Sequence, residues 1–193
     1  YIATWLIPKA QCIRVVSERI KRSLITSKLV RLESQITVLP IFTDIAGFLI
    51  EQPEMETRQK LQEYQFKIIA VGRYMNKEKN FSMLLKAMRI VVKEIPSVLL
   101  MVVGDGPDRT TYEKLIRHYR LKEHVLLGRW RDDLESFYKL FDLYVMSSNH
   151  EGWGRTVIEA MASGVSVVMT DVGLAGEIIK TEENGMVAPV GDY

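Results

Sequence analysis

Two glutamates stand on either side of an expected helix start in residues 147–164, which read Ser-Ser-Asn-His-Glu-Gly-Trp-Gly-Arg-Thr-Val-Ile-Glu-Ala-Met-Ala-Ser-Gly. The two glycines around the tryptophan let the backbone take positive φ values or approach a ligand closely. From Arg155 onward the residues favour a helix, whose first N–H groups are unpaired and whose dipole attracts negative charge. This stretch therefore predicts a phosphate site, with Glu151 before the helix and Glu159 inside it.

The two carboxylates have two interpretations. A carboxylate only accepts hydrogen bonds, so one on each side of a diphosphate suits the hydroxyls of a sugar and a ribose. Alternatively, Glu151 and Glu159 are solvated charges or caps near a positive helix end, each worth a few tenths to about 1 kcal/mol. The residues alone leave both interpretations open.

Basic side chains follow the strand expected at 66–71. Arg73 comes directly after that strand, and Lys79 comes just before the next expected helix. A planar guanidinium and a compact ammonium together suit a diphosphate, although basic loops are also common on ordinary surfaces. Lys77 is a second candidate for the ammonium.

From Phe66 the sequence alternates between strand and helix patterns joined by short turns. Strands are expected at 66–71, 98–103, 124–127, 142–146, 165–169 and 186–188, and helices at 80–94, 108–120, 132–140, 155–163 and 174–180. This alternation predicts an α/β, Rossmann-like parallel sheet with helices on both faces. Ligands of such sheets bind outside the carboxyl ends of the strands.

Residues 1–40 predict a small strand–helix–strand unit, with strands at 12–16 and 36–39 and a helix at 18–31. Such a unit cannot bury a core alone, so it is expected to be part of something larger, as a start without Met also suggests. Cys12 is expected to be a buried strand residue rather than a nucleophile. Residues 41–65 are expected to hold a linker followed by a short exposed helix.

The composition is that of an ordinary globular protein, with 47% apolar and 26% charged residues. The net charge of +2 is uneven: residues 1–40 hold seven Lys or Arg against two Glu, which is +5, so the remainder is −3. The basic face of helix 18–31 suits either an anionic membrane or plain solvent. No aromatic-interleaved basic run indicates nucleic-acid binding, and no run of about 18 apolar residues indicates a membrane span.

The string from Glu151 to Gly164 resembles the donor-site signature E-G-x-G-x-x-x-x-E-A-M-A-x-G of retaining GT-B glycosyltransferases of family 4, also called glycosyl transferase group 1. The resemblance implies that Glu151 contacts the donor sugar and that Glu159 holds the ribose hydroxyls. It also implies three parts, the third being the C-terminal half of a GT-B fold: 1–42 as the end of the N-terminal acceptor-side domain, 43–65 as a linker, and 66–193 as a C-terminally truncated donor-binding domain.

Residues 72–80 resemble the family's G-R-L-x-x-x-K segment, which implies that Arg73 and Lys79 neutralise the donor diphosphate. The sequence departs from that pattern by one extra loop residue and by Tyr74 in place of leucine, so Lys77 still competes with Lys79. Residues 103–107 match V-G-D-G-P, where Asp105 is expected to serve the turn first and a ligand second.

Two further loops resemble the family more loosely. Residues 127–130 stand where the family's F-x-G loop touches the nucleobase, so Arg129 or Trp130 is expected beside the base, with a tryptophan at the core edge as the alternative. Residues 170–177 resemble T-D-V-G-G-x-x-E with Leu174 in place of the second glycine, and Glu177 is expected in the first turn of the next helix.

The resemblance implies a retaining, metal-independent hexosyltransferase of carbohydrate biosynthesis that moves a sugar from a nucleoside diphosphate to an acceptor hydroxyl. The expected partners are a nucleotide-sugar donor, a carbohydrate or lipid-linked acceptor, and the rest of an N-terminal domain. A cytoplasmic location is expected, either free or at the inner face of a membrane. A related sugar-nucleotide epimerase and a non-catalytic nucleotide-binding module are the alternatives.

The expected site needs no cofactor, and the sequence shows no H-E-x-x-H, D-x-D or Cys/His spacing typical of a metal site. His150 adjoins Glu151 and is expected to line the pocket without a catalytic role. Catalytic roles are expected for Glu151, Arg73 and Lys79. The residues expected to bind the donor are Gly72, Arg73, Lys79, Gly104, Arg129, Trp130, Glu151, Gly152, Gly154, Arg155, Thr156 and Glu159.

Overall fold

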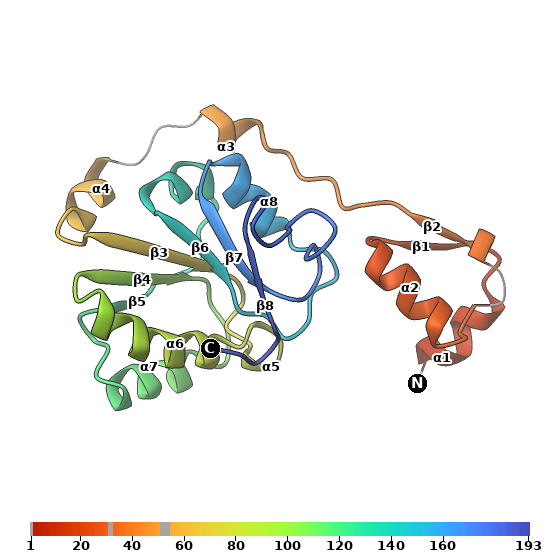
Figure 1. The fold of residues 1–193 in the computed structure, drawn as a ribbon, viewed down its shortest axis with the longest axis horizontal. Coiled ribbons are helices and arrows are strands. Elements are labelled where there is room, and N and C mark those ends of the chain that lie inside the picture. The colour runs from red at the N-terminus through yellow and green to blue at the C-terminus, as the bar shows by residue number, and fades with distance from the viewer. Residues whose placement is uncertain (1, 31–32, 51–54) are drawn as a thin grey trace.

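A computed structural model describes residues 2–30, 33–50 and 55–193. The described residues form two parallel sheets, a two-stranded one near the N-terminus and a six-stranded one that makes up the main body (Figure 1). The larger sheet contains the strands that the sequence predicts from Phe66 onward. Their bounds are β3 (Phe66–Val71), β4 (Val98–Val103), β5 (Val125–Leu127), β6 (Leu143–Met146), β7 (Ser166–Thr170) and β8 (Met186–Ala188).

Side chains of β3 alternate between the two faces of the sheet, as a buried parallel strand requires. Ile69 and Val71 belong to one apolar cluster, and Ile68 and Ala70 belong to the other. The second cluster is completed by α6 (Phe81–Glu94) and α7 (Arg109–His118). The first is completed by α8 (Arg155–Ala162), α3 (Ala46–Ile50) and α4 (Met55–Leu61). The predicted fold class, a parallel sheet with helices on both faces, is therefore confirmed.

The strand order is β5-β4-β3-β6-β7-β8, and every neighbouring pair is parallel. After β3 the chain builds β4 and β5 on one side, and it then returns to place β6 on the other side. The order therefore reverses between β3 and β6, which is the switch point where doubly wound sheets bind ligands. The loop that contains α5 (Asn76–Lys79) follows β3, and the loop that leads into α8 follows β6.

The N-terminal segment contains α1 (Ile2–Leu6), β1 (Ile13–Val15), α2 (Glu18–Thr26) and β2 (Ile36–Val38), with 3-10 turns at Ile7–Lys9 and Glu33–Gln35. Among its described residues, only Val15, Ser17 and Ile36 are buried. This small core agrees with the expectation that the unit cannot fold by itself. No helix in the described parts of the chain is long and apolar enough to cross a membrane.

Two predicted helices are wrong. Residues 132–140 form two short 3-10 turns, Leu134–Ser136 and Tyr138–Leu140, and Phe137 and Tyr138 are fully buried there. Residues 174–180 form turns closed by a bridge between Ala175 and Ile179. Gly176, with φ of 76°, takes the left-handed conformation that interrupts a helix there.

The predictions for the N-terminal segment also need correction. Helix α2 ends at Thr26 rather than at residue 31, since the Ser27 hydroxyl donates to the carbonyl of Ser23 at 2.6 Å and Lys28 takes a φ of 55°. Cys12 precedes β1 and is exposed, so the expectation of a buried strand residue is wrong.

Candidate functional site

A lysine and a glutamate meet at the switch point of the sheet. The ammonium of Lys79, in the loop after β3, contacts Oε1 of Glu151, in the loop after β6, and their side chains are only 21% and 15% exposed. The same Oε1 accepts a hydrogen bond from the Ser148 hydroxyl at 2.9 Å. Two of the residues that the sequence predicts for one site are therefore in direct contact.

Local geometry explains why Lys79, and not Lys77, reaches Glu151. Helix α5 is a single turn that ends at Lys79, and it carries the lysine back over the end of β3. A Cβ atom on Gly72 would lie 3.2 Å from Cε of Lys79, so the absence of a side chain at Gly72 makes room for the lysine stem. Lys77 is exposed and lines the neighbouring hollow. A carboxylate oxygen of Asp108, which the sequence analysis missed, accepts from the first N–H of α5 at 2.7 Å.

Asn149 joins the two loops. Its backbone N–H donates to the carbonyl of Glu78 at 2.7 Å, and its side-chain amide donates to the carbonyl of Lys77 at 3.1 Å. Its Oδ1 accepts from the side chain of Asn80 at 2.9 Å. Because both loops are tied at this residue, they act as one unit that holds Lys79 beside Glu151.

The start of α8 places the second glutamate. Gly154 precedes the helix with a φ of 115°, a value that favours glycine. Glu159 is buried at 7% exposure, accepts from the Tyr138 hydroxyl at 3.2 Å and lies 3.8 Å from Nη2 of Arg155. Burial raises the pKa of Glu159, and the Tyr138 hydrogen bond and the Arg155 charge oppose this shift. The Thr156 hydroxyl forms a hydrogen bond with the buried Tyr144 hydroxyl at 2.7 Å, so its side chain contacts the core.

Arg73 is exposed at the end of β3, and its Nη1 lies 3.7 Å from Sδ of Met75. The turn after β4 lies very close to the backbone at the end of β3. A Cβ on Gly104 would lie 1.9 Å from the carbonyl oxygen of Gly72, so no side chain fits at Gly104. Asp105 accepts from the N–H of Gly106 at 2.7 Å, which is the turn role that the sequence predicts.

The loop expected beside a nucleobase is exposed. Trp130 is 62% exposed and donates from Nε1 to Asp132 at 3.0 Å, so the alternative of a tryptophan at the core edge is wrong. Arg129 is exposed as well. Tyr74 anchors the loop, since its buried hydroxyl lies 2.8 Å from the carbonyl oxygens of both Val102 and Gly128. The sequence showed Tyr74 only as a departure from the family's leucine, so this role was not predicted.

A hollow of about 700 Å³ lies beside the Lys79–Glu151 pair. It is lined by residues 149–152 and 171–173, by Met75, Lys77 and Glu78, and by Arg19 from the N-terminal segment. His150 is one of these lining residues, as expected. Within residues 2–30, 33–50 and 55–193, no three His, Cys, Asp or Glu side chains gather in a way that could hold a metal ion.

The α/β fold matches that of GT-B glycosyltransferase structures. A family model described as "Glycosyl transferases group 1" matches residues 51–193. The chain belongs to this family.

Named relatives agree with this assignment. The chain is 30% identical over 189 residues to the capsular polysaccharide biosynthesis glycosyltransferase CapM of Staphylococcus aureus, which covers 92% of this chain and 48% of CapM. It is 32% identical over 125 residues to the lipopolysaccharide core biosynthesis glycosyltransferase LpsE of Rhizobium meliloti (strain 1021), which covers 65% of this chain and 35% of LpsE. The chain thus spans less than half the length of these relatives.

A solved structure shows the same fold. The crystal structure of Anabaena Alr3699/HepE in complex with UDP and glucose matches with a TM-score of 0.84 at 22% sequence identity, covering 99% of this chain and 53% of that chain. The match includes the N-terminal segment as well as the six-stranded sheet.

Proposed function

We propose that this chain binds a nucleoside-diphosphate sugar at the switch point of its sheet. As part of a complete GT-B enzyme, it would transfer the sugar to an acceptor hydroxyl and retain the anomeric configuration. The observation that supports the proposal is the contact between Lys79 and Glu151, which brings a cation and the carboxylate proposed to bind the sugar from two separate loops to one place.

The expected chemistry follows from the charges. Transfer breaks the bond between the anomeric carbon and the diphosphate oxygen and forms a bond from that carbon to the acceptor oxygen, whose proton is released. Negative charge grows on the departing diphosphate, and stabilising that charge lowers the barrier. Arg73, Lys79 and the backbone N–H groups at the start of α8 are the donors proposed for this task.

The carboxylates have separate roles in this proposal. Glu151 would accept from sugar hydroxyls once the diphosphate draws the Lys79 ammonium away. Glu159 would accept hydrogen bonds from the ribose hydroxyls, because its carboxylate is buried and one of its oxygens already accepts from a hydroxyl, that of Tyr138. The metal-independent and cytoplasmic character and the lipid-linked acceptor remain predictions of the same proposal.

Calorimetric titration of residues 1–193 with UDP, GDP and ADP, without metal, tests the binding step. UDP comes first because several similar structures were solved with it. We expect one nucleotide to bind and Arg73→Ala and Glu159→Ala each to weaken it about tenfold, the effect of about 1.4 kcal/mol. A folded chain that binds none of the three, or binds all equally after both substitutions, contradicts the proposal.

An epimerase and a non-catalytic module are separated by product analysis. With the longer protein, labelled donor and an acceptor, the proposal expects sugar on the acceptor. An epimerase releases an altered sugar nucleotide without an acceptor, and a binding module returns the donor unchanged. The Lys79–Glu151 pair disfavours the module, because a scaffold has no use for a half-buried cation and carboxylate at a ligand site.

A further inference from the structure

The N-terminus of helix α2 contacts the main body of the protein. The Glu177 carboxylate accepts the backbone N–H of Glu18 at 3.1 Å and that of Arg19 at 2.7 Å, and so caps the first turn of a helix about 160 positions earlier in the chain. The Ser17 hydroxyl accepts the N–H of Ile20 at 3.2 Å. The expectation that Glu177 lies in the first turn of a following helix is wrong, because residues 174–180 form turns, and its carboxylate caps α2 instead.

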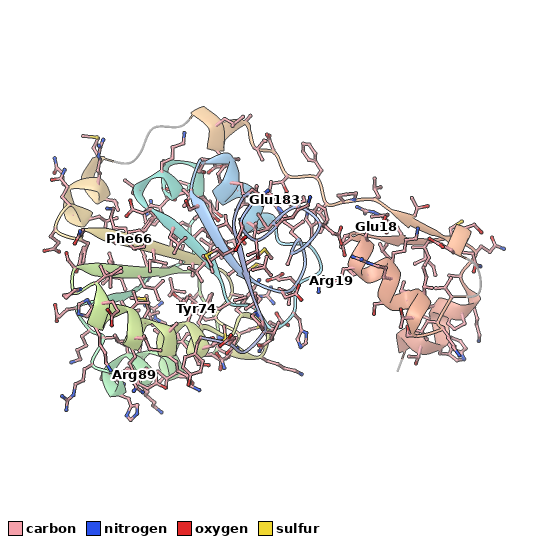
Figure 2. All side chains as sticks on the ribbon, in the orientation of Figure 1. Glu18, Arg19, Phe66, Tyr74, Arg89 and Glu183 are labelled. Atoms are coloured by element: carbon pink, nitrogen blue, oxygen red, sulfur yellow. The ribbon has the colours of Figure 1, made fainter. Side chains whose placement is uncertain are left out.

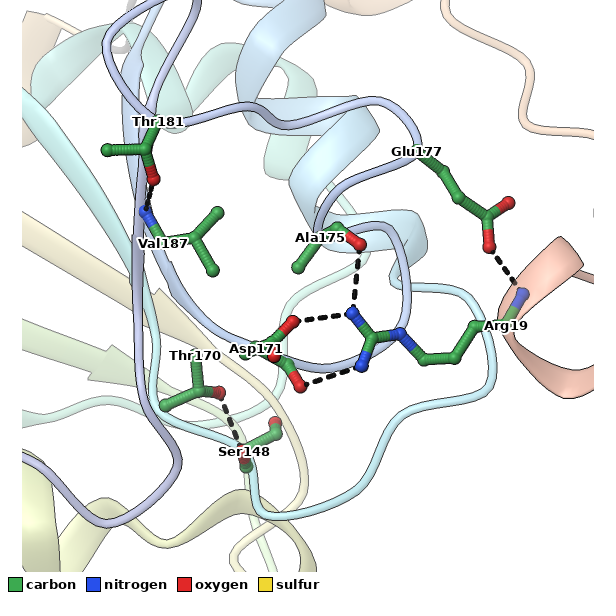
Figure 3. A network of polar contacts seen from close by, with 8 residues as sticks. All are labelled: Arg19, Ser148, Thr170, Asp171, Ala175, Glu177, Thr181 and Val187. Carbon is green, nitrogen blue, oxygen red and sulfur yellow. Dashed lines mark hydrogen bonds and ion pairs between the residues drawn. The ribbon is translucent and has the colours of Figure 1, made fainter. Parts of the chain in front are cut away.

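Arg19 makes the reciprocal contact, as Figure 3 shows. Its Nη2 donates to Oδ1 of Asp171 at 2.5 Å and to the carbonyl of Ala175 at 3.0 Å. Its Nη1 donates to the carbonyl of Asp171 at 3.2 Å. One planar guanidinium therefore spans the turn between Asp171 and Ala175, while Glu177 from the same segment grips the helix that carries Arg19.

The same part of α2 also touches the glutamate loop. A Cβ on Gly152 would lie 3.7 Å from Cγ2 of Val16 and 3.9 Å from Cδ1 of Ile20. Arg19 itself lines the 700 Å³ hollow together with Glu151. The segment of 171–177 and the loop of Glu151 are thus both in contact with the start of α2.

We propose that Arg19 and Glu177 are positioning residues that form a latch between the N-terminal segment and residues 171–177. The latch fixes which side chains of the N-terminal segment face the donor sugar. This consequence rests on the function proposed above, but the latch itself does not.

The form of the contacts distinguishes a latch from an ordinary surface ion pair. The side chains of Arg19 and Asp171 are 38% and 54% exposed, and an isolated pair of that kind contributes little. Here one guanidinium binds three oxygens, two of them backbone carbonyls that no substitution of Asp171 removes. Lysine has the charge but not the planar fork, so Arg19→Lys should release the latch nearly as fully as Arg19→Ala.

Spin labels measure the latch directly. The single cysteine, Cys12, is exposed at the start of β1. A second label site is created by Lys114→Cys on the exposed face of α7. We expect a narrow distance distribution in the doubly labelled chain, and a distribution about twofold wider or more in Arg19→Ala, Arg19→Lys and Glu177→Gln, because a released segment moves as a loop does.

The matched control is Arg22→Ala, which removes the same charge from the next turn of the same helix, where Arg22 is exposed. It should leave the distribution unchanged. An unchanged distribution in Arg19→Ala and Glu177→Gln overturns the latch, and so does equal broadening in Arg22→Ala. The melting temperature of the main body should stay nearly unchanged, and the UDP Kd should stay within about twofold of the parent value, whereas a general loss of structure would change both.

The two proposals fail separately. If the parent chain binds no nucleotide but shows the expected change in distances, the latch stands and the donor site does not. If UDP binds and the distances do not respond to the Arg19 and Glu177 substitutions, the donor site stands and the latch does not.

Discussion

Glu159 is a carboxylate whose position costs stability. Its side chain is buried, and burial raises its pKa above the ordinary 4.5. Below that unfolded value the group is protonated in both states, so its burial carries no charge penalty. As the pH rises through the folded pKa, the ionised group must be kept out of water, and stability is lost. This cost is consistent with the ribose-binding role proposed above for Glu159.

Glu159→Gln should therefore raise the melting temperature of the ligand-free chain at pH 7.5 and change it little at pH 4, since glutamine never ionises. It should at the same time weaken nucleotide binding. Thermal unfolding at both pH values, beside Glu183→Gln at an exposed position, measures the first effect. A parent and a variant that melt alike at pH 7.5 would show that the buried charge costs nothing.

The two candidate lysines can be separated by substitution. Lys79→Ala leaves the Glu151 carboxylate with only the Ser148 hydroxyl from the contacts described above, which should destabilise the fold by about 1–3 kcal/mol. It should also weaken diphosphate binding about tenfold or more, the loss of one charged hydrogen bond. Lys77→Ala should change both quantities little, because Lys77 is exposed.

A double variant separates stability from binding. In Lys79→Ala combined with Glu151→Ala, the unpaired carboxylate is gone, so the melting temperature should recover while nucleotide affinity stays low. If affinity falls with Lys77→Ala and not with Lys79→Ala, the assignment of the diphosphate lysine is reversed.

At the scale of elements, the strands were the most predictable part of the chain. Runs such as Val98–Val103 are buried on both faces, and the sequence shows them as uninterrupted apolar stretches. The predicted helices at 132–140 and 174–180 are wrong, because helical spacing alone does not show what interrupts a helix. Phe137 and Tyr138 are fully buried in the first segment, and Gly176, with a φ of 76°, interrupts the second beside the local bridge of Ala175 to Ile179.

The part of the site that directly follows the strands could be predicted from the sequence. Arg73, Lys79 and Glu151 follow strands, so the sequence brings them to one edge of the sheet. The bonds that hold them could not be foreseen, because an amide such as Asn149 that binds backbone carbonyls needs no particular partner residue. The latch of Arg19 on Asp171 was equally hidden, because it joins residues 152 positions apart.

Asn149→Ala tests whether the clasp between the two loops matters for binding. It removes two side-chain hydrogen bonds, one to Lys77 and one from Asn80, and should destabilise the fold by about 1–3 kcal/mol. Looser loops hold Lys79 and Glu151 less firmly, so nucleotide affinity should fall by roughly threefold to tenfold, or about 0.7–1.4 kcal/mol.

Asn184→Ala is the matched control for that experiment. Asn184 also bridges backbone groups, donating to Ile178 at 2.8 Å and accepting from Lys180 at 2.9 Å, but it lies outside the site. It should lower stability by a similar amount and leave nucleotide affinity unchanged. Equal losses of affinity in the two variants would mean that Asn149 acts only through general stability.

At the scale of the molecule, the main body holds nearly all of the core. Both apolar clusters consist of buried residues from Phe48 onward, and Val16 is the only member of the N-terminal segment packed against either of them among the described residues. Figure 2 shows Glu18 and Arg19 where the N-terminal segment approaches the main body, far from Phe66 at the other end of the sheet. The chain therefore consists of a main body and an attached N-terminal segment, and Phe48 and Leu61, which lie in the expected linker 43–65, pack into the core of the main body.

A chain of residues 43–193 should consequently fold, because it keeps Phe48, Leu61 and every strand of the large sheet. It loses the exposed Arg19 latch and the packing of Val16 against the main-body core. Its melting temperature should therefore drop by only about 2–8 °C, which corresponds to a loss of roughly 1–2 kcal/mol in the free energy of unfolding. Residues 1–42 alone should be unfolded by circular dichroism, since three buried residues cannot offset chain entropy.

Nucleotide titration of the shorter chain then locates the donor site. Lys79, Glu151 and Glu159 all remain in it, so its Kd should stay within about threefold of that of residues 1–193, a difference of about 0.7 kcal/mol. A much larger loss would place part of the nucleotide site on the N-terminal segment, where Arg19 is the side chain that already lines the hollow. If the Kd of the shorter chain is intact and Arg19→Ala abolishes transfer in the longer protein, the N-terminal segment belongs to the acceptor side. The latch would then hold this segment beside the bound sugar.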